Sequence, residues 1–248
     1  MKRTILSSLV LIVAFLTAGP LAQTQGGPLP TIDQVLDKYI AGIGGRAAME
    51  KVTSKVAKGT MEIAEAGLNG TMTMSMKAPD KSLIILDLPG MGTAREGTDG
   101  SVAWSEDPQT GLREKTGAEA ADSKRGAVFN GDLKLKSLYK TLEVTGRDKV
   151  GTKDVIVVTA TPELGAVTRM YFDTASGLLL RQSATRDTAQ GPIDVDVYLE
   201  DYRDVDGVKE AFVIRQVTAQ FTLLARINEI KHNLPLDDAI FKKPGAPR

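Results

Sequence analysis

The side chains that could carry acid–base or nucleophilic chemistry are few and widely spaced in this chain of 248 residues. The sequence has a single histidine, His232, and no cysteine. A Ser/His/Asp hydrolase needs its histidine beside a nucleophile, and no Gly-x-Ser-x-Gly turn supplies one. His232 follows the last apolar run, in EIKHNLP, so we expect it to be solvated. We therefore predict no catalytic residues and no enzymatic activity.

Carboxylate pairs and methionines are the remaining groups that could bind a metal ion. The carboxylate pairs are Asp194/Asp196, Asp201/Asp204 and Asp237/Asp238. Calcium or magnesium needs more oxygens from one tight loop, and DYRDVDG lacks the rest of a loop of about twelve residues. Copper(I) binds thioethers, but the methionines of GTMTMSMKAP are spread along one extended segment without cysteine or histidine nearby. We predict no metal site and no cofactor.

The segment GTMTMSMKAP, residues 70–79, alternates methionine with threonine or serine. A period of two predicts a strand with one apolar face, and the unbranched thioether adapts to partners of varied shape. This face could therefore be ordinary core or the lining of a lipid cavity. We place it inward, against helices, with Thr71, Thr73 and Ser75 on a convex face in water. The candidate cavity-lining residues, which could all share the inward side, are Met72, Met74, Met76, Leu86, Leu88, Trp104, Met170, Phe172, Val195 and Val197.

The elements that would position these residues are one helix and many short strands. Residues 31–45, TIDQVLDKYIAGIGG, carry apolar side chains at helical spacing and end in a Gly-Gly stop. From residue 51 the period changes to two. The Ala- and Lys-rich stretch at 117–140 predicts two short helical pieces. We predict a mainly β fold, a single strongly curved antiparallel sheet. This unclosed half-barrel of about 10 to 11 strands has an N-terminal helix and a helical segment covering its concave apolar face.

Turn signals support hairpins between consecutive strands. Asp-Gly dipeptides occur at 99–100 and 206–207, and this pair is among the strongest short-range hairpin signals. Gly111 and Gly177 close two similar turns that begin with aspartate, so we expect both glycines at positive φ.

The charge balance and the first residues define the setting. With 31 basic and 31 acidic residues the chain has no net charge, which argues against a nucleic-acid partner. Lys2 and Arg3 precede an apolar run that ends in small residues, as in a secretory signal peptide. We predict a signal peptide at 1–22, a flexible linker at 23–30, a single domain at 31–241 and a flexible tail at 242–248.

Several segments, in order, resemble a known family. They are VLDKYIAGIGGRAAMEKVTSKVAKGTMEI, DGSVAW, YFDTASGLLLR, VYLEDYRDVDGVKEAFVI and INEIKHNLPLDDAIFKKP. Together they are similar to the outer-membrane lipoprotein-sorting proteins of Gram-negative bacteria, relatives of the LolA and LolB lipoprotein carriers. The resemblance implies an unclosed, curved sheet covered by helices, with a hydrophobic cavity that takes acyl chains.

The expected function follows from this resemblance and from the missing catalytic groups. We predict a periplasmic carrier that holds lipid or the acyl chains of lipoproteins, in outer-membrane lipoprotein sorting. Its cargo would be lipid or lipidated protein, exchanged with a membrane-associated donor or acceptor, and the chain would be a monomer. The alternative is a non-catalytic structural or protein-interaction module of the cell envelope. In that module side chains would fill the core, and no pocket of about 300 Å³, the lower size limit of a ligand site, would remain.

Overall fold

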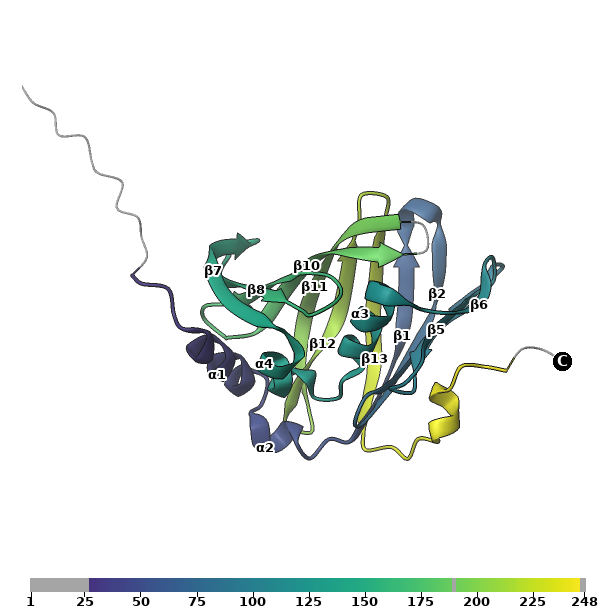
Figure 1. The fold of residues 1–248 in the computed structure, drawn as a ribbon, viewed down its shortest axis with the longest axis horizontal. Coiled ribbons are helices and arrows are strands. Elements are labelled where there is room, and N and C mark those ends of the chain that lie inside the picture. The colour runs from purple at the N-terminus through teal and green to yellow at the C-terminus, as the bar shows by residue number, and fades with distance from the viewer. Residues whose placement is uncertain (1–26, 189–190, 246–248) are drawn as a thin grey trace, which may run out of the picture.

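The computed structural model describes residues 27–188 and 191–245. The predicted signal peptide at 1–22, most of the predicted linker and the end of the predicted tail lie outside the described residues. The described chain is mainly β, as predicted, with one antiparallel sheet and a few short helices (Figure 1). No helix in these ranges has both the length and the apolar character needed to cross a membrane.

The sheet has thirteen strands within the described residues, in the spatial order β6-β5-β4-β3-β2-β1-β13-β12-β11-β10-β9-β8-β7. β6 and β7 are its two edges, so the sheet is not closed, as predicted. The strand number exceeds the expected 10 to 11, partly because the four-residue β6 is too short to show a period of two. The strands are β1 (Ser54–Ile63), β2 (Leu68–Lys77), β3 (Lys81–Leu88), β4 (Gly92–Thr98), β5 (Ala103–Asp107), β6 (Gly111–Glu114), β7 (Thr141–Val150), β8 (Lys153–Thr161), β9 (Thr168–Asp173), β10 (Leu179–Thr188), β11 (Gly191–Val205), β12 (Val208–Val217) and β13 (Thr222–His232).

The strands form two meanders that meet in the middle of the sheet. The chain enters the sheet at β1 and runs outward to β6. It then crosses to β7 at the opposite edge and returns to β13, which pairs with β1. The crossing segment contains α3 (Gly117–Ala127), the 3₁₀ turn η2 (Gly131–Lys134) and α4 (Leu135–Leu138). Because this segment joins both edges, it passes over one face of the curved sheet. It covers the concave face (Figure 1).

The N-terminal helix α1 (Ile32–Gly42) begins at a capping box. The Thr31 hydroxyl accepts a hydrogen bond from the Gln34 backbone N–H at 3.3 Å, and Gln34 Oε1 accepts one from the Thr31 N–H at 2.8 Å. The helix ends before Gly44 and Gly45, whose φ values of +115° and +86° leave the helical region. A single turn, α2 (Arg46–Met49), then leads into β1. The sequence-predicted helix is confirmed.

The predicted turns require glycine for two reasons. In the β11–β12 hairpin, Asp206 and Gly207 both have positive φ, at 54° and 83°, as a type I′ turn demands. Gly111 and Gly177 have φ of 74° and 78°, as predicted. At Gly177 an added Cβ would also lie 2.6 Å from the Lys38 carbonyl oxygen of α1. This turn therefore sets how closely α1 approaches the sheet.

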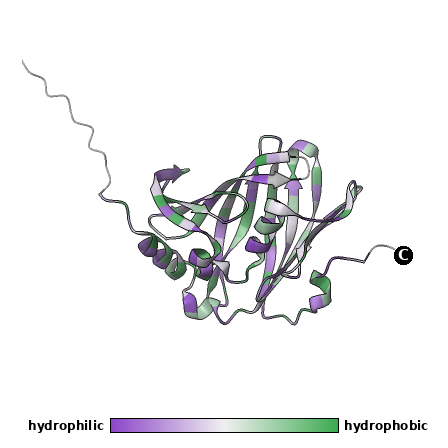
Figure 2. Cartoon of the chain, in the orientation of Figure 1, coloured by the Kyte–Doolittle hydropathy of each residue, from purple (hydrophilic) through white to green (hydrophobic). Residues whose placement is uncertain are grey.

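Hydrophobic residues alternate with hydrophilic ones along most strands (Figure 2), and the buried ones form three clusters. The largest, the α1 cluster, joins Leu36 and Tyr39 of α1 to Val155, Val158 and Phe172 of β8 and β9. The second, on the concave side of β1, β2, β12 and β13, contains Ala57, Met72, Phe212, Ala225 and Ile227. The third contains Leu83, Trp104 and Phe241.

The third cluster lies on the opposite face of the sheet, under a C-terminal strap that we define as residues 233–241, including the turn η3 (Asp238–Phe241). The Trp104 Nε1–H donates to the Phe241 carbonyl at 3.0 Å. Lys77 and Lys81 hold Asp238 at 2.7 and 2.5 Å. Ser75 on this face is only 7% exposed. The expectation that the Thr/Ser face of β2 lies in water is therefore wrong at Ser75.

Candidate functional site

An inner pocket of about 420 Å³ lies between the concave face of the sheet and the covering helices. Its lining is mainly apolar side chains, and carboxylates paired with basic side chains lie at two places in it. The sheet contributes Met74, Met76, Met170, Leu199, Ile214, Ile227 and Ile230, and the helical side contributes Tyr39, Met49, Phe129, Leu135 and Leu138.

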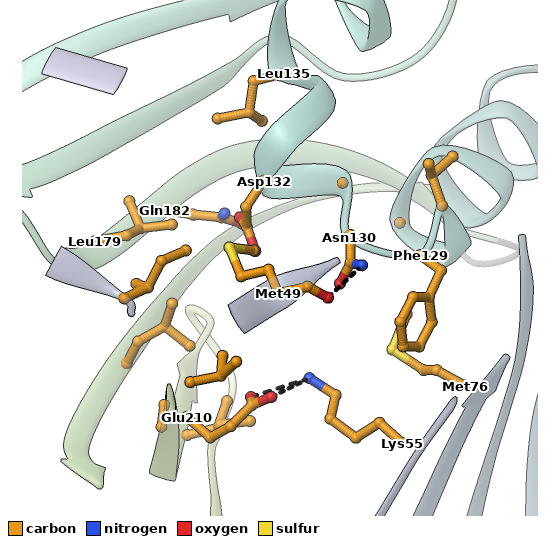
Figure 3. Close-up of a pocket in the computed structure, with 18 of the residues that line it drawn as sticks. Met49, Lys55, Met76, Phe129, Asn130, Asp132, Leu135, Leu179, Gln182 and Glu210 are labelled. Carbon is orange, nitrogen blue, oxygen red and sulfur yellow. Dashed lines mark hydrogen bonds and ion pairs between the residues drawn. The ribbon is translucent and has the colours of Figure 1, made fainter. Parts of the chain in front are cut away.

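The methionines of β2 form one wall of this pocket. Alternation along the strand turns Met72, Met74 and Met76 to the same side. Met74 and Met76 line the pocket and are only half-buried, whereas Met72 is packed into the second cluster. Met76 lies beside Phe129 of the crossing segment, which covers the pocket and which we call the covering segment from here on (Figure 3). The methionine face is thus turned toward the helices.

Asn130 fixes the covering segment over the pocket. Its backbone has φ of +52°, and this left-handed residue separates α3 from η2. Its side-chain amide donates to the Met49 carbonyl at 2.9 Å and to the Val52 carbonyl at 3.3 Å. The bond to Met49 is visible in Figure 3. Two segments far apart in sequence are therefore tied together at the rim of the pocket.

The first polar place in the lining, which we call the floor, is an ion pair between Lys55 of β1 and Glu210 of β12. Lys55 Nζ lies 3.2 and 3.0 Å from the two Glu210 carboxylate oxygens (Figure 3). Burial raises the pKa of Glu210, but the charge of Lys55 and a hydrogen bond from His232 outweigh it. The net pKa is lowered, so this carboxylate stays ionised.

His232 lies behind this ion pair and is not solvated, so that expectation is wrong. Its side chain is 1% exposed, because β13 ends between the β1 strand and the β11–β12 hairpin. Nε2 lies 3.3 Å from Glu210, and Nδ1 lies 3.2 Å from an Asp206 oxygen. In the described part of the chain, no serine hydroxyl hydrogen-bonds to this imidazole. The ring thus has carboxylates on both sides.

Asp132 of η2 is a second carboxyl group at the floor. It accepts a hydrogen bond from the Tyr39 hydroxyl at 2.8 Å, which joins α1 to the covering segment. Burial raises the pKa of Asp132, and the Tyr39 hydrogen bond only partly offsets this. Burial likewise raises the pKa of Tyr39 and of Tyr202, whose hydroxyl donates to the Leu179 carbonyl at 2.7 Å. The floor thus contains one ionised carboxylate and one that keeps its proton more readily.

The second polar place, which we call the mouth, is built around Asp122 of α3. Arg125 pairs with this carboxylate, and Arg186 of β10 approaches it at 3.7 Å. The Asp122 oxygens also accept the Ala166 backbone N–H at 3.1 and 3.2 Å. Asp122 is 9% exposed and Arg125 13%, while Arg186 is 39% exposed although it lines the pocket. Arg186 therefore stands where the pocket meets water.

Neither place is built as a metal site. Among residues 27–188 and 191–245, no group of three or more His, Cys, Asp or Glu side chains is positioned to hold a metal ion.

Comparison with known proteins gives matches among solved structures only. No family model matches the sequence, and no curated protein matches it. A DUF1329 family protein from Desulfovibrio piger aligns with a TM-score of 0.60 at 13% identity, covering 86% of this chain and 98% of that one. A LolA superfamily protein from Nitrosomonas europaea gives 0.58 at 13% identity, covering 87% and 99%. A domain from Vibrio parahaemolyticus assigned to outer membrane lipoprotein sorting gives 0.57 at 14% identity, covering 85% and 95%.

The chain has a LolA-like fold. The resemblance found in the sequence is thereby confirmed for the fold. At 13–14% identity the likeness extends to the arrangement of strands and helices and not to individual site residues.

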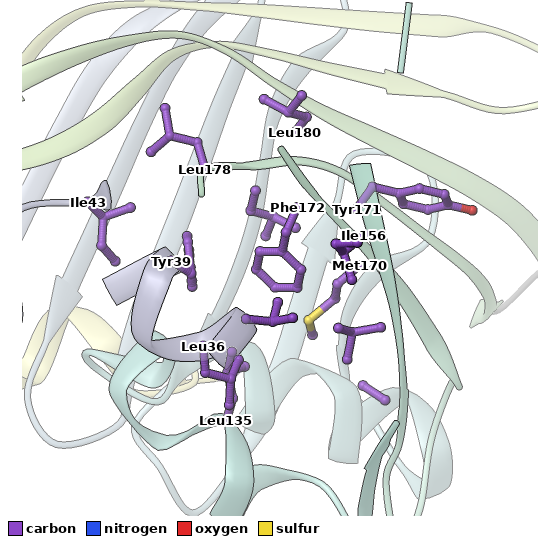
Figure 4. Close-up of a cluster of buried hydrophobic side chains, with 14 of the residues drawn as sticks. Leu36, Tyr39, Ile43, Leu135, Ile156, Met170, Tyr171, Phe172, Leu178 and Leu180 are labelled. Carbon is purple, nitrogen blue, oxygen red and sulfur yellow. The ribbon is translucent and has the colours of Figure 1, made fainter. Parts of the chain in front are cut away.

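Within this LolA-like fold, three of the ten sequence-predicted lining residues line the inner pocket: Met74, Met76 and Met170. Met72 and Leu86 belong to the neighbouring second cluster. Phe172 is packed against Tyr39 in the α1 cluster (Figure 4), with ring centroids 5.1 Å apart.

The other four predicted residues lie away from the pocket. Val195 is buried, whereas Val197 and Leu88 are half-buried. None of these three residues lines the pocket. The prediction that Trp104 faces the pocket is wrong, because this residue lies under the C-terminal strap on the opposite face and is 1% exposed. The hairpin between β4 and β5 reverses the chain, and the period of two in VAWSED does not tell which face its tryptophan takes.

The polar residues of the LolA-like pocket were missed by sequence reasoning. Glu210 shares the inward face of β12 with Phe212 and Ile214, and Lys55 shares that of β1 with Ala57. The sequence did contain a signal for them: a charged residue occupies one of the alternating positions whose other members are apolar and face inward. On β10 the same alternation places Gln182 and Arg186 on the inward face, and both line the pocket.

Proposed function

We propose that this protein binds the acyl chains of a lipid or lipidated protein in the inner pocket and carries them without catalysing a reaction. The observation that carries the proposal is the pocket of about 420 Å³ under the helical cover. Its volume falls in the range of small-molecule sites, roughly 300–1,000 Å³. The alternative of a completely filled envelope module predicts no such space.

The methionine wall suits a flexible apolar guest. Met74 and Met76 are half-buried although they face the interior, so a guest would cover apolar surface that the protein leaves open. Burying about ten methylenes contributes on the order of 8 kcal/mol, at ~0.8 kcal/mol each, before the costs of association. Methionine side chains can also repack around chains of different length or unsaturation.

We propose the same role and place for the protein as the sequence resemblance implies: outer-membrane lipoprotein sorting in the periplasm. Support comes from the LolA-like fold, which it shares with a domain assigned to that process. On this proposal the protein acts as a monomer between a membrane-associated donor and acceptor, with no nucleic-acid partner and no cofactor.

The direct test is to purify the protein, extract it and identify bound lipid by mass spectrometry, with titration of a fluorescent long-chain fatty acid. We expect co-purifying lipid or saturable binding with one site per chain. Absence of both would contradict the proposal and favour the filled module.

A matched pair of variants locates the binding. Met74→Trp should fill the pocket and weaken fatty-acid binding by about tenfold or more, because the larger side chain occupies the space of the guest. Thr71→Trp, on the exposed face of the same strand, should leave binding unchanged. If the two variants weaken binding equally, or if Met74→Trp loses stability in proportion to binding, the guest does not lie against the methionines.

A further inference from the structure

The charges that line the pocket are not balanced equally at its two polar places. At the floor, Lys55 is paired with Glu210, which also contacts His232. At the mouth, one carboxylate, Asp122, faces two guanidinium groups. The mouth therefore has an excess positive charge, and the floor pair is matched.

The two arginines of the mouth are engaged differently. Arg125 pairs with Asp122, donates to the Leu164 carbonyl at 3.0 Å and lies 5.2 Å from the ring centroid of Tyr139. Arg186 has only the 3.7 Å approach to Asp122, and within the described residues no hydrogen bond holds its guanidinium. It is also the more exposed of the two. Of the two mouth arginines, Arg186 is therefore the one with donors left for a ligand.

A guanidinium offers a flat set of donors that matches a carboxylate or phosphate. Arg186 lies on the same face of β10 as Gln182, further inside the pocket, and Ala184 stands between them. The opposite wall has Met74 and Met76. An elongated guest with one anionic end and one apolar end would match this order of groups.

The reverse orientation is disfavoured by the floor. An anionic group placed there would compete with Glu210 for Lys55 and would leave the Glu210 carboxylate, only 18% exposed, with His232 as its one remaining partner among the described residues. Burying an unpaired charge is strongly unfavourable. At the mouth an anion meets an incompletely paired arginine that already contacts water.

We propose that the pocket selects anionic amphiphiles, with the acyl chain against the β2 methionines and a carboxylate or phosphate headgroup paired with Arg186. This inference rests on the proposed lipid-binding function and specifies the ligand class and its orientation. The shared chemistry is an oxyanion attached to a long apolar chain.

The test compares a long-chain fatty acid with its methyl ester, which has the same chain and no charge, each by displacement of a fluorescent lipid. Wild-type protein should bind the acid about tenfold more tightly than the ester, and this preference should shrink as salt rises from ~0.05 to ~0.5 M. Arg186→Gln should remove the preference by weakening the acid alone, and Arg186→Lys should restore part of it. Arg203→Gln, an exposed arginine outside the pocket lining, is the matched control and should have no effect.

Different failures have different meanings. If neither acid nor ester binds, the proposed function itself fails. If both bind equally to wild type and Arg186→Gln changes nothing, lipid binding stands and the headgroup inference is overturned. Inorganic phosphate separates a headgroup from a free anion: if it displaces the lipid as well as a phosphorylated lipid does, the mouth is a small-anion site and the joint binding of chain and headgroup is wrong.

Discussion

Two halves of the same concave face differ in how their space is filled. In the half formed by β7 to β10, the concave face is packed tightly beneath α1 and borders the inner pocket at its rim, through residues that include Met170, Gln182 and Arg186. Val158 and Ala160 have no exposed surface there, and Phe172 is 2% exposed. In the half formed by β1 to β3 with β12 and β13, Met74 and Met76 stay half-buried beside the inner pocket. We call these the filled half and the hollow half.

The covering elements account for the difference. The filled half is covered by α1, which points Val35, Leu36 and Tyr39 at the sheet. The hollow half is covered by the segment from α3 to α4, and α3 buries only Ala127 fully. A helix of small and charged side chains can span a curved sheet without filling the space beneath it. Space for a guest therefore depends on which side chains the cover carries, since both halves use similar apolar strands.

The largest effect that tests this comparison is expected from truncating one side chain in each half. Phe172→Ala should lower the free energy of unfolding by about 3–5 kcal/mol, as for other buried phenylalanines. Met74→Ala should cost only about 1 kcal/mol, because a half-exposed side chain loses less buried area. Urea unfolding followed by circular dichroism measures both. Equal losses would show that the hollow half is packed in solution.

A smaller effect is expected from adding atoms. Ala160→Met in the filled half should destabilise the protein by about 1–3 kcal/mol through overpacking. Ala57→Met adds the same atoms at a residue that is buried in the second cluster but borders the pocket, so its cost should be smaller than that of Ala160→Met. Thermal unfolding of the two variants, with fatty-acid titration of the second, distinguishes free space from tight packing. A larger loss for Ala57→Met than for Ala160→Met would contradict the assignment of the two halves.

The smallest effect concerns pH at the floor, where Tyr39 of the filled half meets Asp132. The pKa of Asp132 is raised on folding, so the protonated carboxyl group of Asp132 stabilises the folded state. This stabilisation is complete below the ordinary aspartate pKa and is lost as pH rises through the folded-state pKa. The pKa of Glu210 is lowered, so its contribution is present above the ordinary glutamate pKa and is lost as pH falls through the folded-state pKa.

Two substitutions separate these opposite dependences. Asp132→Asn should make stability decline less as pH rises, and Glu210→Gln should make it decline less on acidification. The free energy of unfolding, measured from about pH 3 to about pH 8, covers the ordinary carboxyl range. Parallel changes in the two variants would show that the carboxyl groups do not titrate in opposite directions.

The sequence predicted the architecture well because its signals are local. The helical spacing and Gly-Gly stop of residues 31–45, the period of two along the strands and the Asp-Gly turns each depend on a few neighbouring residues. The β1–β13 pairing, by contrast, joins segments at opposite ends of the domain, and no local signal in the sequence predicted it.

The site was predicted less completely for the same reason. Met74, Met76 and Met170 were found because an alternating apolar face is visible in the sequence. Trp104 was misplaced because its burial comes from Phe241 of the distant C-terminal strap. His232 is buried by Glu210 and Asp206, which no local pattern connects to it. Pairings of this kind become visible only once the strands are in register.

The pairing of the first strand with the last also has a kinetic consequence. The Thr53 N–H donates to Asn233 Oδ1 at 2.8 Å across 180 residues of sequence. Contacts at such separation form only after a long loop has closed, which slows folding. Until β13 arrives, β1 keeps one edge of unpaired backbone groups, which can recruit strands from other chains. We therefore expect newly made chains to fold late, after the final strand is available, and to aggregate when folding is interrupted before that step.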